Sequence, residues 1–469
     1  MDLSRIEKIE IPFEQLLPDE CYLVGGTIRD ALLGFDPIDF DIVVPKDAIG
    51  LALRIRREIE DSRLVILSKE DDEVRLVFST GEWLDITSFR AETIEEDLKL
   101  RDFTINSLAV PIRDRSKLLD PTGGLIDLQK RLLRTYSPRN LESDPLRILR
   151  AFRFVSTIEF DIEDETFKWI KERADSVTKA APERIRYELF RLFNGEAVSK
   201  AVRLMAQSGV LFALFPPLKE QLDLKQRYIV EQNVFEHTML VIEFLEKLIK
   251  EVIELRGVMG KYHHRLFPYL ADRRFRFAFY LGALLHDVAK PRTIFYDEEG
   301  RTHFHGHDKL GAQIAAELAE RLRLSNYEKD ILTLMVAAHM HPHLLAREKD
   351  VTMRALNRYL RRTGDLAFPL ILFTVADALA TPPIGKGAEG QLRLAEKLEK
   401  LLREKEKKPK KRLVTGHDII KLGLQPGPIF KKILQEIEDL EAEGKIKTRE
   451  DALRELQRIV KLVKEGRFK

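Results

Sequence analysis

Residues 22–44 constrain the fold more than any other stretch: an apolar run enters a Gly-Gly turn, a short helix follows, and a strand then begins at Asp39. Side chains alternate between the two faces of a strand, so Asp39 and Asp41 point to one side while Phe40 points into the core. Two carboxylates on one face are costly unless a cation lies between them, and hard oxygen ligands suit Mg²⁺ held together with substrate phosphates. The strand therefore predicts a magnesium site.

The turn before this strand is suited to a phosphate. Gly25 and Gly26 let the backbone approach closely, the N–H groups that open the next helix face the same space, and Arg29 adds a charged donor. Taken alone, a Gly-Gly turn is usually only a turn, and Asp-x-Asp is commonly a solvated strand edge. Together these parts predict two-metal phosphoryl transfer.

The complete string over residues 25–41, Gly-Gly-x-x-Arg-Asp-x-Leu-Leu-Gly followed by Asp-x-Asp, is far more specific than its parts. It resembles the signature of the class II tRNA nucleotidyltransferase (CCA-adding) and bacterial poly(A) polymerase family, and the likeness extends over nearly the whole chain. The resemblance implies an α+β fold with a small mixed-sheet nucleotidyltransferase head (1–140), an all-α neck with a base-reading helix (141–225), an HD-type helical body (226–385) and a helical tail that binds tRNA (386–469).

Composition limits the class of protein. A chain of 469 residues suggests three or more domains or a modular helical body, and 44% apolar with 33% charged residues is typical of a folded soluble protein. The net charge of +2 means that an RNA partner must be held by local basic patches. The lone Cys21 excludes a disulfide framework and a cysteine-based zinc site. With no signal peptide and no long apolar run, we expect a cytoplasmic protein without a membrane partner.

Further head residues follow from the resemblance. Asp85 is polar amid apolar strand neighbours and is a candidate third carboxylate that activates the primer hydroxyl; the alternative is the exposed face of an edge strand. Residues 96–109 are similar to the family's second motif, which implies that Arg101 binds the triphosphate and that Asp102 and Asn106 bind the sugar. The family usually has two adjacent arginines here, whereas this chain has a leucine before Arg101.

Only six residues separate Arg90 from Asp97. Family members that complete the CCA end, or add A, carry a longer flexible loop at this place, which helps to switch the pocket from C to A. The short connection therefore resembles the CC-adding subgroup. A short natural variant of a full CCA-adding enzyme is the competing interpretation.

A basic row marks the neck. Ser143 as N-cap with a proline in the first turn predicts a helix start, after which Asp144, Arg147, Arg150 and Arg153 recur every third residue. A solvated face with ion pairs is the alternative. The family uses a Glu-Asp-x-x-Arg helix to read the incoming base, which implies that Asp144 and Arg147 pair with cytosine while the other two arginines face the triphosphate or support the reader. Ser143 replaces the family's Glu, so another group must orient Arg147.

Ten of the eleven histidines lie between residues 237 and 343. Their order, His … His-Asp … His … His … Asp with each part on a separate helix, resembles the HD phosphohydrolase superfamily. The resemblance implies one metal held by His237, His286, Asp287 and Asp377, and a second held by His307 and His339. Imidazole plus carboxylate suits a transition metal or Mg²⁺ that activates water for phosphoester hydrolysis. A vestigial, tRNA-binding body is the alternative.

The tail carries a basic run at 406–412 and four lysines that we expect to meet the tRNA backbone: Lys431, Lys432, Lys445 and Lys447. The chain is thus predicted to add C residues from CTP to the 3′ end of tRNA without a template, as a monomer or dimer. The alternatives are a full CCA-adding enzyme that also uses ATP, a poly(A) polymerase, and an HD phosphohydrolase with an inactive head.

Overall fold

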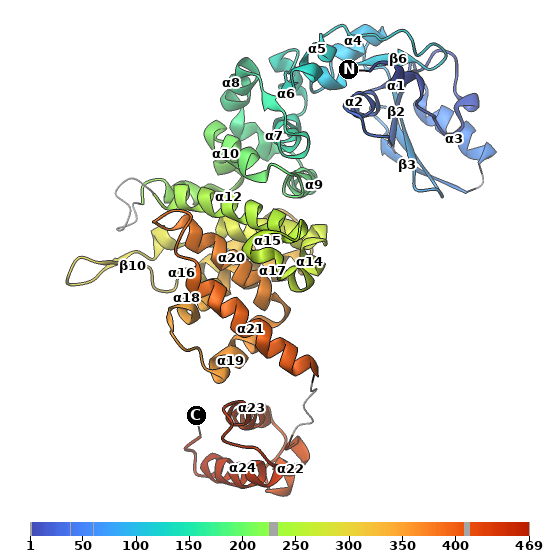
Figure 1. The fold of residues 1–469 in the computed structure, drawn as a ribbon. Helices are drawn as coiled ribbons and strands as arrows, with labels where there is room; N and C mark the ends of the chain where they lie inside the picture. The colour runs from blue at the N-terminus through green and yellow to red at the C-terminus, as the bar shows by residue number, and fades with distance from the viewer. Residues whose placement is uncertain (1, 38, 60, 225–232, 408–412, 469) are drawn as a thin grey trace. The chain divides into compact units, whose positions relative to one another are not determined.

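The computed structural model describes residues 2–37, 39–59, 61–224, 233–407 and 413–468, so most of the basic run at 406–412 lies outside the described residues. The chain forms two compact units, Met1–Pro216 and Pro217–Lys469 (Figure 1). The α+β class is confirmed: the strands of the large sheet all belong to the first unit, and helices dominate the second.

The head contributes the following elements: α1 (Ser4–Glu7), η1 (Glu14–Leu16), β1 (Tyr22–Val24), α2 (Gly26–Leu33), β2 (Asp39–Val44), α3 (Ala48–Glu58), β3 (Ser62–Ser68), β4 (Glu73–Phe78), β5 (Trp83–Ser88), α4 (Ile94–Lys99), η2 (Thr104–Asn106), β6 (Ala109–Pro111), α5 (Gly124–Gln129) and β7 (Leu132–Leu133). Buried and partly exposed residues alternate along β4 and β5, as expected for strands with one covered face. Six strands form one sheet in the order β3-β4-β5-β2-β1-β6.

The centre of this sheet sets the positions of the charged residues. β2 and β5 run parallel, and every other neighbouring pair is antiparallel. The register places Asp41 opposite Asp85, and Asp85 opposite Arg75 on β4. Phe40, between the two aspartates of β2, is only 3% exposed, which confirms the predicted alternation of faces.

The neck within the same unit consists of α6 (Pro138–Ser143), α7 (Leu146–Ile158), β8 (Asp161–Ile162), α8 (Asp164–Glu172), η3 (Ala174–Lys179), α9 (Pro182–Leu192), α10 (Val198–Ser208) and α11 (Val210–Leu214). Helix α7 packs against α9 and α10, and its Phe154 meets Phe103 of the head edge-on at 5.7 Å between ring centroids. The helix of the basic row is therefore held against the head by apolar contacts.

The predicted helix start at Ser143 is wrong. Ser143 is the last residue of α6 and its hydroxyl donates to the Asn140 carbonyl oxygen. A residue before proline is pushed out of the helical region, and Asp144 is accordingly extended, with φ −145° and ψ 102°. The helix α7 begins at Leu146, whose N–H donates to the Asp144 carboxylate.

The short helix η4 (Pro216–Gln221) spans the boundary between the units, and the described part of the second unit is helical apart from one small hairpin. Its elements are α12 (Val234–Ile253), α13 (Gly257–Gly260), α14 (His263–Leu270), α15 (Arg273–Leu285), η5 (Lys290–Arg292), β9 (Phe295–Tyr296), β10 (Thr302–His303), α16 (His307–Arg321), α17 (Asn326–Ala338), α18 (Met340–Arg347), α19 (Met353–Thr363), η6 (Gly364–Leu366), α20 (Ala367–Ala380), α21 (Glu389–Lys407), α22 (Gly416–Lys421), α23 (Pro428–Ala442) and α24 (Arg449–Lys464). His237 lies in the first turn of α12.

The apolar helix α20 forms the core of the body, where it packs against α12 and α21. One helical stretch, Met353–Ala380, is long and apolar enough to cross a membrane, but 72% of its most apolar window is buried inside the structure. That burial is typical of a core helix. α21, which the sequence assigned to the tail, packs on α18 and α20, whereas α22 to α24 share a separate apolar cluster around Ile433 and Leu456.

Candidate active site and metal centre

The close approach of β2 to the start of α2 builds the first site. The N–H of Gly26 donates to Asp41 Oδ2 at 3.0 Å. A Cβ at Gly25 or Gly26 would lie 3.1 Å from the same oxygen, and Gly25 has φ +66°, so both positions favour glycine. Thr27 locks the arrangement: its hydroxyl donates to the Asp39 carbonyl oxygen and accepts from the Asp41 N–H. Asp39 itself is exposed.

Negative charge accumulates at this edge of the sheet. Burial and the neighbouring Asp85 raise the pKa of Asp41 to about 6, because the charged form is poorly solvated and repelled. Arg75 is hydrogen-bonded to Asp85, through two bonds of 2.7 Å from Nε and Nη2, whereas the pKa of Asp41 is lowered by the charge of the nearby Arg101 and by the N–H of Gly26. Asp41 thus lacks a partner of equal strength. The oxygen-only donor set and this raised pKa fit a divalent cation held by Asp39 and Asp41.

The residues predicted to bind the sugar form a connected chain. Arg29 donates to Asn106 at 2.6 Å, Asn106 donates to Asp102 at 2.9 Å, and Asp102 forms an ion pair of 2.8 Å with Arg150 of α7. Burial alone would raise the pKa of Asp102, but Arg150 and Arg147 lower it to about 2. The structure therefore brings head and neck residues together around one carboxylate that is charged near neutral pH.

The connection between β5 and α4 is short and fixed at both ends. The N–H of Arg90 donates to Asp97 Oδ1 at 3.0 Å, and the Thr93 side chain caps α4 by accepting from the N–H of Glu96. The other oxygen of Asp97 forms an ion pair of 3.3 Å with Arg101. Arg101, which we expect to bind the triphosphate, therefore pairs with Asp97, the same residue that accepts the hydrogen bond from Arg90.

The two residues expected to read the base have other partners in this structure. Arg147 is 8% exposed and donates to the carbonyl oxygens of Leu100 and Asn140. Asp144 accepts from Arg184 of α9 at 2.8 Å. Sequence reasoning assigned no chemistry to the helix that carries Arg184, and nothing in the spacing of residues 144–153 points to it.

The side chain of Arg153 is buried, whereas a side chain that binds the nucleotide would have to be accessible to it. Its side chain and that of Glu188 on α9 are each 6% exposed and form an ion pair of 3.0 Å. The guanidinium also covers the ring of Phe154 at 4.2 Å. This placement fits the supporting role, in which Arg153 holds α7 against α9, and Glu188 was not foreseen.

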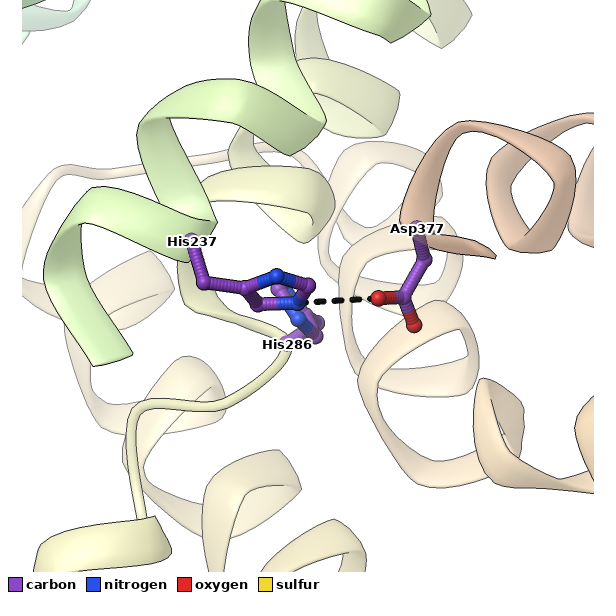
Figure 2. Close-up of side chains that lie close together, drawn as sticks. All are labelled: His237, His286 and Asp377. Carbon is purple, nitrogen blue, oxygen red and sulfur yellow. Dashed lines mark ion pairs between the residues drawn. The ribbon is translucent and has the colours of Figure 1, made fainter. Parts of the chain in front are cut away.

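The histidine-rich body brings the six predicted metal ligands into two groups, each with ligand atoms within 4.8 Å of one another. The first contains His237, His286 and Asp377 (Figure 2), and the second contains Asp287, His307 and His339. Asp287 joins them, because its Oδ2 lies 3.1 Å from His286 and its Oδ1 lies 3.5 Å from His307. The sequence had placed Asp287 with the first group only.

The hydrogen bonds of the imidazoles show what this centre lacks. In each histidine Nδ1 faces a backbone carbonyl oxygen: His237 with Ala380, His286 with Ala283, His307 with Phe304 and His339 with Val336. A carbonyl only accepts, so each Nδ1 carries the proton and each Nε2 turns its lone pair into the centre. Nε2 of His286 is buried without a hydrogen-bond partner among the described residues. Four imidazole lone pairs directed at two carboxylates, each of which has only one donor beside it in the described part of the chain, Lys290 and His343 respectively, fit a cation.

The pKa shifts agree with this reading. Burial and the neighbouring His286 lower the pKa of His339 to about 3, so His339 is neutral. Although burial opposes it, Asp287 raises the pKa of His286. His286 and Lys290, whose Nζ lies 2.6 Å from Oδ2, hold the pKa of Asp287 well below its usual range. The raised pKa means that His286 Nε2, 3.1 Å from Asp287 Oδ2, attracts a positive charge, which either a proton or a metal ion would supply.

Three known families match successive parts of the chain: the poly A polymerase head domain (21–134), the probable RNA and SrmB-binding site of polymerase A (159–222) and the HD domain (234–381). The A-adding tRNA nucleotidyltransferase of Deinococcus radiodurans is 30% identical over 94% of this chain and 96% of its own length. The chain belongs to the tRNA nucleotidyltransferase family. It is therefore an enzyme that transfers nucleotides from a nucleoside triphosphate to the 3′ end of tRNA.

Other members of the tRNA nucleotidyltransferase family are similar over the same extent. The CC-adding tRNA nucleotidyltransferase of Thermus thermophilus is 30% identical over 95% of this chain and 94% of its own. The structure of the Thermotoga maritima CCA-adding enzyme complexed with tRNA superimposes with a TM-score of 0.63, at 24% identity, over 97% and 98% of the two chains. The fold of a CCA-adding enzyme is thus shared along the whole length. Both the nucleotidyltransferase and the HD domain are metal-dependent, which agrees with the candidate metal-binding groups of the body.

Proposed function

We propose that this tRNA nucleotidyltransferase adds C residues from CTP to tRNA that lacks its CCA end, and stops before A. The observation that carries the proposal is the short β5–α4 connection, closed by the bond from Arg90 to Asp97 and the Thr93 cap. A flexible element that re-shapes the pocket for A has no room between these fixed points. Relatives named A-adding and CC-adding are equally identical to the chain, so A addition is the competing activity.

Each head residue has a role in this proposal. Asp39 and Asp41 hold Mg²⁺, which when bound stabilises the negative charge on the transferring phosphoryl group and its oxygens. Asp85, in register with Asp41, takes the proton of the primer hydroxyl. The N–H groups opening α2, together with Arg29 and Arg101, orient the triphosphate.

The base is read at the start of α7. A carboxylate accepts from the exocyclic amine of cytosine, and a guanidinium donates to its ring nitrogen and carbonyl. Asp144 supplies its carboxylate once it releases Arg184, and Arg147 supplies its guanidinium once it releases the carbonyl oxygens of Leu100 and Asn140. Asp102, held charged between Asn106 and Arg150, accepts from the ribose hydroxyls.

Primer extension tests the proposal. The protein is incubated with tRNA lacking CCA, tRNA ending in C and tRNA ending in CC, each with CTP or ATP alone. We expect C addition to the first two primers and no product on the third. Efficient A addition to tRNA ending in CC would overturn the CC reading, and C addition together with A addition would show a full CCA-adding enzyme.

We further propose that the HD centre hydrolyses phosphoesters, such as a 2′,3′-cyclic phosphate at an RNA end. The observation that favours this activity is the set of lone pairs turned inward by the four carbonyl-bound imidazoles. A divalent cation held there polarises a phosphoester and the attacking water. The test is the opening of a 2′,3′-cyclic nucleotide by water to the nucleoside 2′- or 3′-monophosphate: Asp287→Asn should abolish it, whereas Asp41→Asn should leave it unchanged. Equal hydrolysis by the Asp287→Asn protein would reject the activity.

A further inference from the structure

His343 touches the HD centre although the family pattern does not include it. It lies on α18, and its Nε2 is 2.6 Å from Asp377 Oδ2. The other oxygen of Asp377, Oδ1, lies 2.9 Å from Nε2 of His237, one of the proposed metal ligands. The Asp377 carboxylate is thus held by one imidazole outside the metal groups, while its second oxygen stays beside the ligands shown in Figure 2.

The direction of the hydrogen bond follows from the other side of the ring. Gln391, on α21 and only 7% exposed, places its amide nitrogen 3.1 Å from Nδ1 of His343. An amide nitrogen only donates, so Nδ1 accepts and the ring proton sits on Nε2. Nε2 therefore donates to Asp377 Oδ2. The three side chains form a directed series, Gln391 to His343 to Asp377, across helices α21, α18 and α20.

We propose that His343, oriented by Gln391, is a positioning residue that fixes the Asp377 carboxylate so that Oδ1 points to the metal. The proposal rests on the proposed metal site of the HD body. A carboxylate on a helix can rotate about its terminal bond, and a donor fixed to one oxygen removes that freedom. Partners of this kind typically change metal affinity about 10-fold to 100-fold. His343 cannot itself bind the metal in this arrangement, because its Nε2 carries the proton.

The experiment measures metal binding rather than turnover. Co²⁺ is titrated into the full-length protein with Asp39→Ala and Asp41→Ala to silence the head, and the visible absorption of bound Co²⁺ is followed. We expect His343→Ala to weaken Co²⁺ binding about 10-fold to 100-fold. His343→Gln places an amide donor near the position of Nε2 and should recover most of the affinity. Gln391→Leu, which leaves Nδ1 unpaired, should fall between them.

His341→Ala is the matched control, since His341 lies on the same helix, is partly exposed and meets Tyr359 instead of the centre. Its Co²⁺ affinity should equal that of the parent protein. Unchanged affinity in His343→Ala, or a loss in His343→Gln as large as in His343→Ala, would overturn the positioning role. A parent protein that binds no Co²⁺, or that binds it equally well after His286→Ala, would instead reject the metal site itself. Circular dichroism of each metal-free variant confirms that it is folded.

Discussion

His307 and His339 face each other through their Nε2 atoms, 3.2 Å apart. The carbonyl oxygens of Phe304 and Val336 hold the proton of each ring on Nδ1, so two lone pairs meet. The low pKa of His339, about 3, rules out relief by a proton on that ring near neutral pH. Repulsion between the rings disappears when both nitrogens share a cation, so metal binding and packing of α16 against α17 are coupled.

Metal removal should therefore destabilise the body. Because a ligand that binds only the folded state stabilises it by mass action, a metal present at 100 times its dissociation constant adds about 2.7 kcal/mol. We expect a chelator to lower the thermal unfolding midpoint of the Pro217–Lys469 unit, as followed by calorimetry. His307→Ala should abolish the response. An equal chelator effect in that variant would show that the stabilising metal is bound elsewhere.

Metal binding in the head should depend on pH through Asp41, whose pKa of about 6 comes from burial and from Asp85. Between about pH 4 and 6 the folded protein keeps a proton that the unfolded chain has lost, so this group stabilises the fold at low pH and loses that contribution as the pH rises through 6. Cation binding has the opposite dependence. At pH 5 the apparent affinity should be about 10-fold lower than at pH 7.

Electron paramagnetic resonance of free Mn²⁺ measures this affinity directly, in a His286→Ala background that removes the HD centre. Asp85→Asn is the matched variant: it removes one cause of the raised pKa of Asp41, so its midpoint should move below pH 6. Identical pH profiles in the two proteins would contradict the assignment to Asp41.

Arg75 should matter for catalysis without touching substrate. Its two bonds to Asp85 fix a carboxylate that would otherwise rotate, and its guanidinium is held in turn over Trp83 at 5.2 Å. We expect Arg75→Met to lower kcat for C addition about 10-fold to 100-fold with little change in KM, because a displaced catalytic group loses its alignment. Arg63→Met, an exposed arginine on the adjacent strand β3, is the control and should retain full kcat. A selective rise in KM would point to nucleotide binding instead.

Removing one partner of the buried Arg153–Glu188 ion pair should strongly destabilise the neck. Both side chains are 6% exposed, and burial lowers the pKa of Arg153 to about 9. Glu188→Ala leaves a buried guanidinium uncompensated and should cost about 3–5 kcal/mol of unfolding free energy. The double variant Arg153→Met/Glu188→Leu should recover most of that loss. Thermal melts of the three proteins test this; a double variant as unstable as the single one would show that the charges themselves are required.

Much of the head could be predicted because its signals are local. The period-2 pattern of residues 73–78 and 83–88 and the Gly-Gly turn at 25–26 specify strands and a turn without reference to the rest of the chain. The start of α7 was misplaced because the extended conformation imposed on Asp144 by the following proline outweighed the capping preference of Ser143.

The partners of the site residues could not be predicted in the same way. Arg75 meets Asp85 only because two antiparallel strands adopt one register, and Arg184 reaches Asp144 across 40 residues of chain. His343 was visible in the sequence as one of three alternating histidines. Only the packing of α18 against α20 and α21 shows that it, rather than His341, contacts the centre.

The inward-facing donors of the HD centre come from α12, α16 and α20 and from the ends of α15 and α17. The ligand atoms that would bind the metal therefore also connect these five segments of chain to one another. Even if the hydrolysis were no longer needed, substitution of any of these ligand residues would destabilise the body, because the rest of the unit packs on the helices that they connect. The presence of all six ligand residues is for that reason a weaker indication of hydrolytic activity than it would be if these residues lay in a loop.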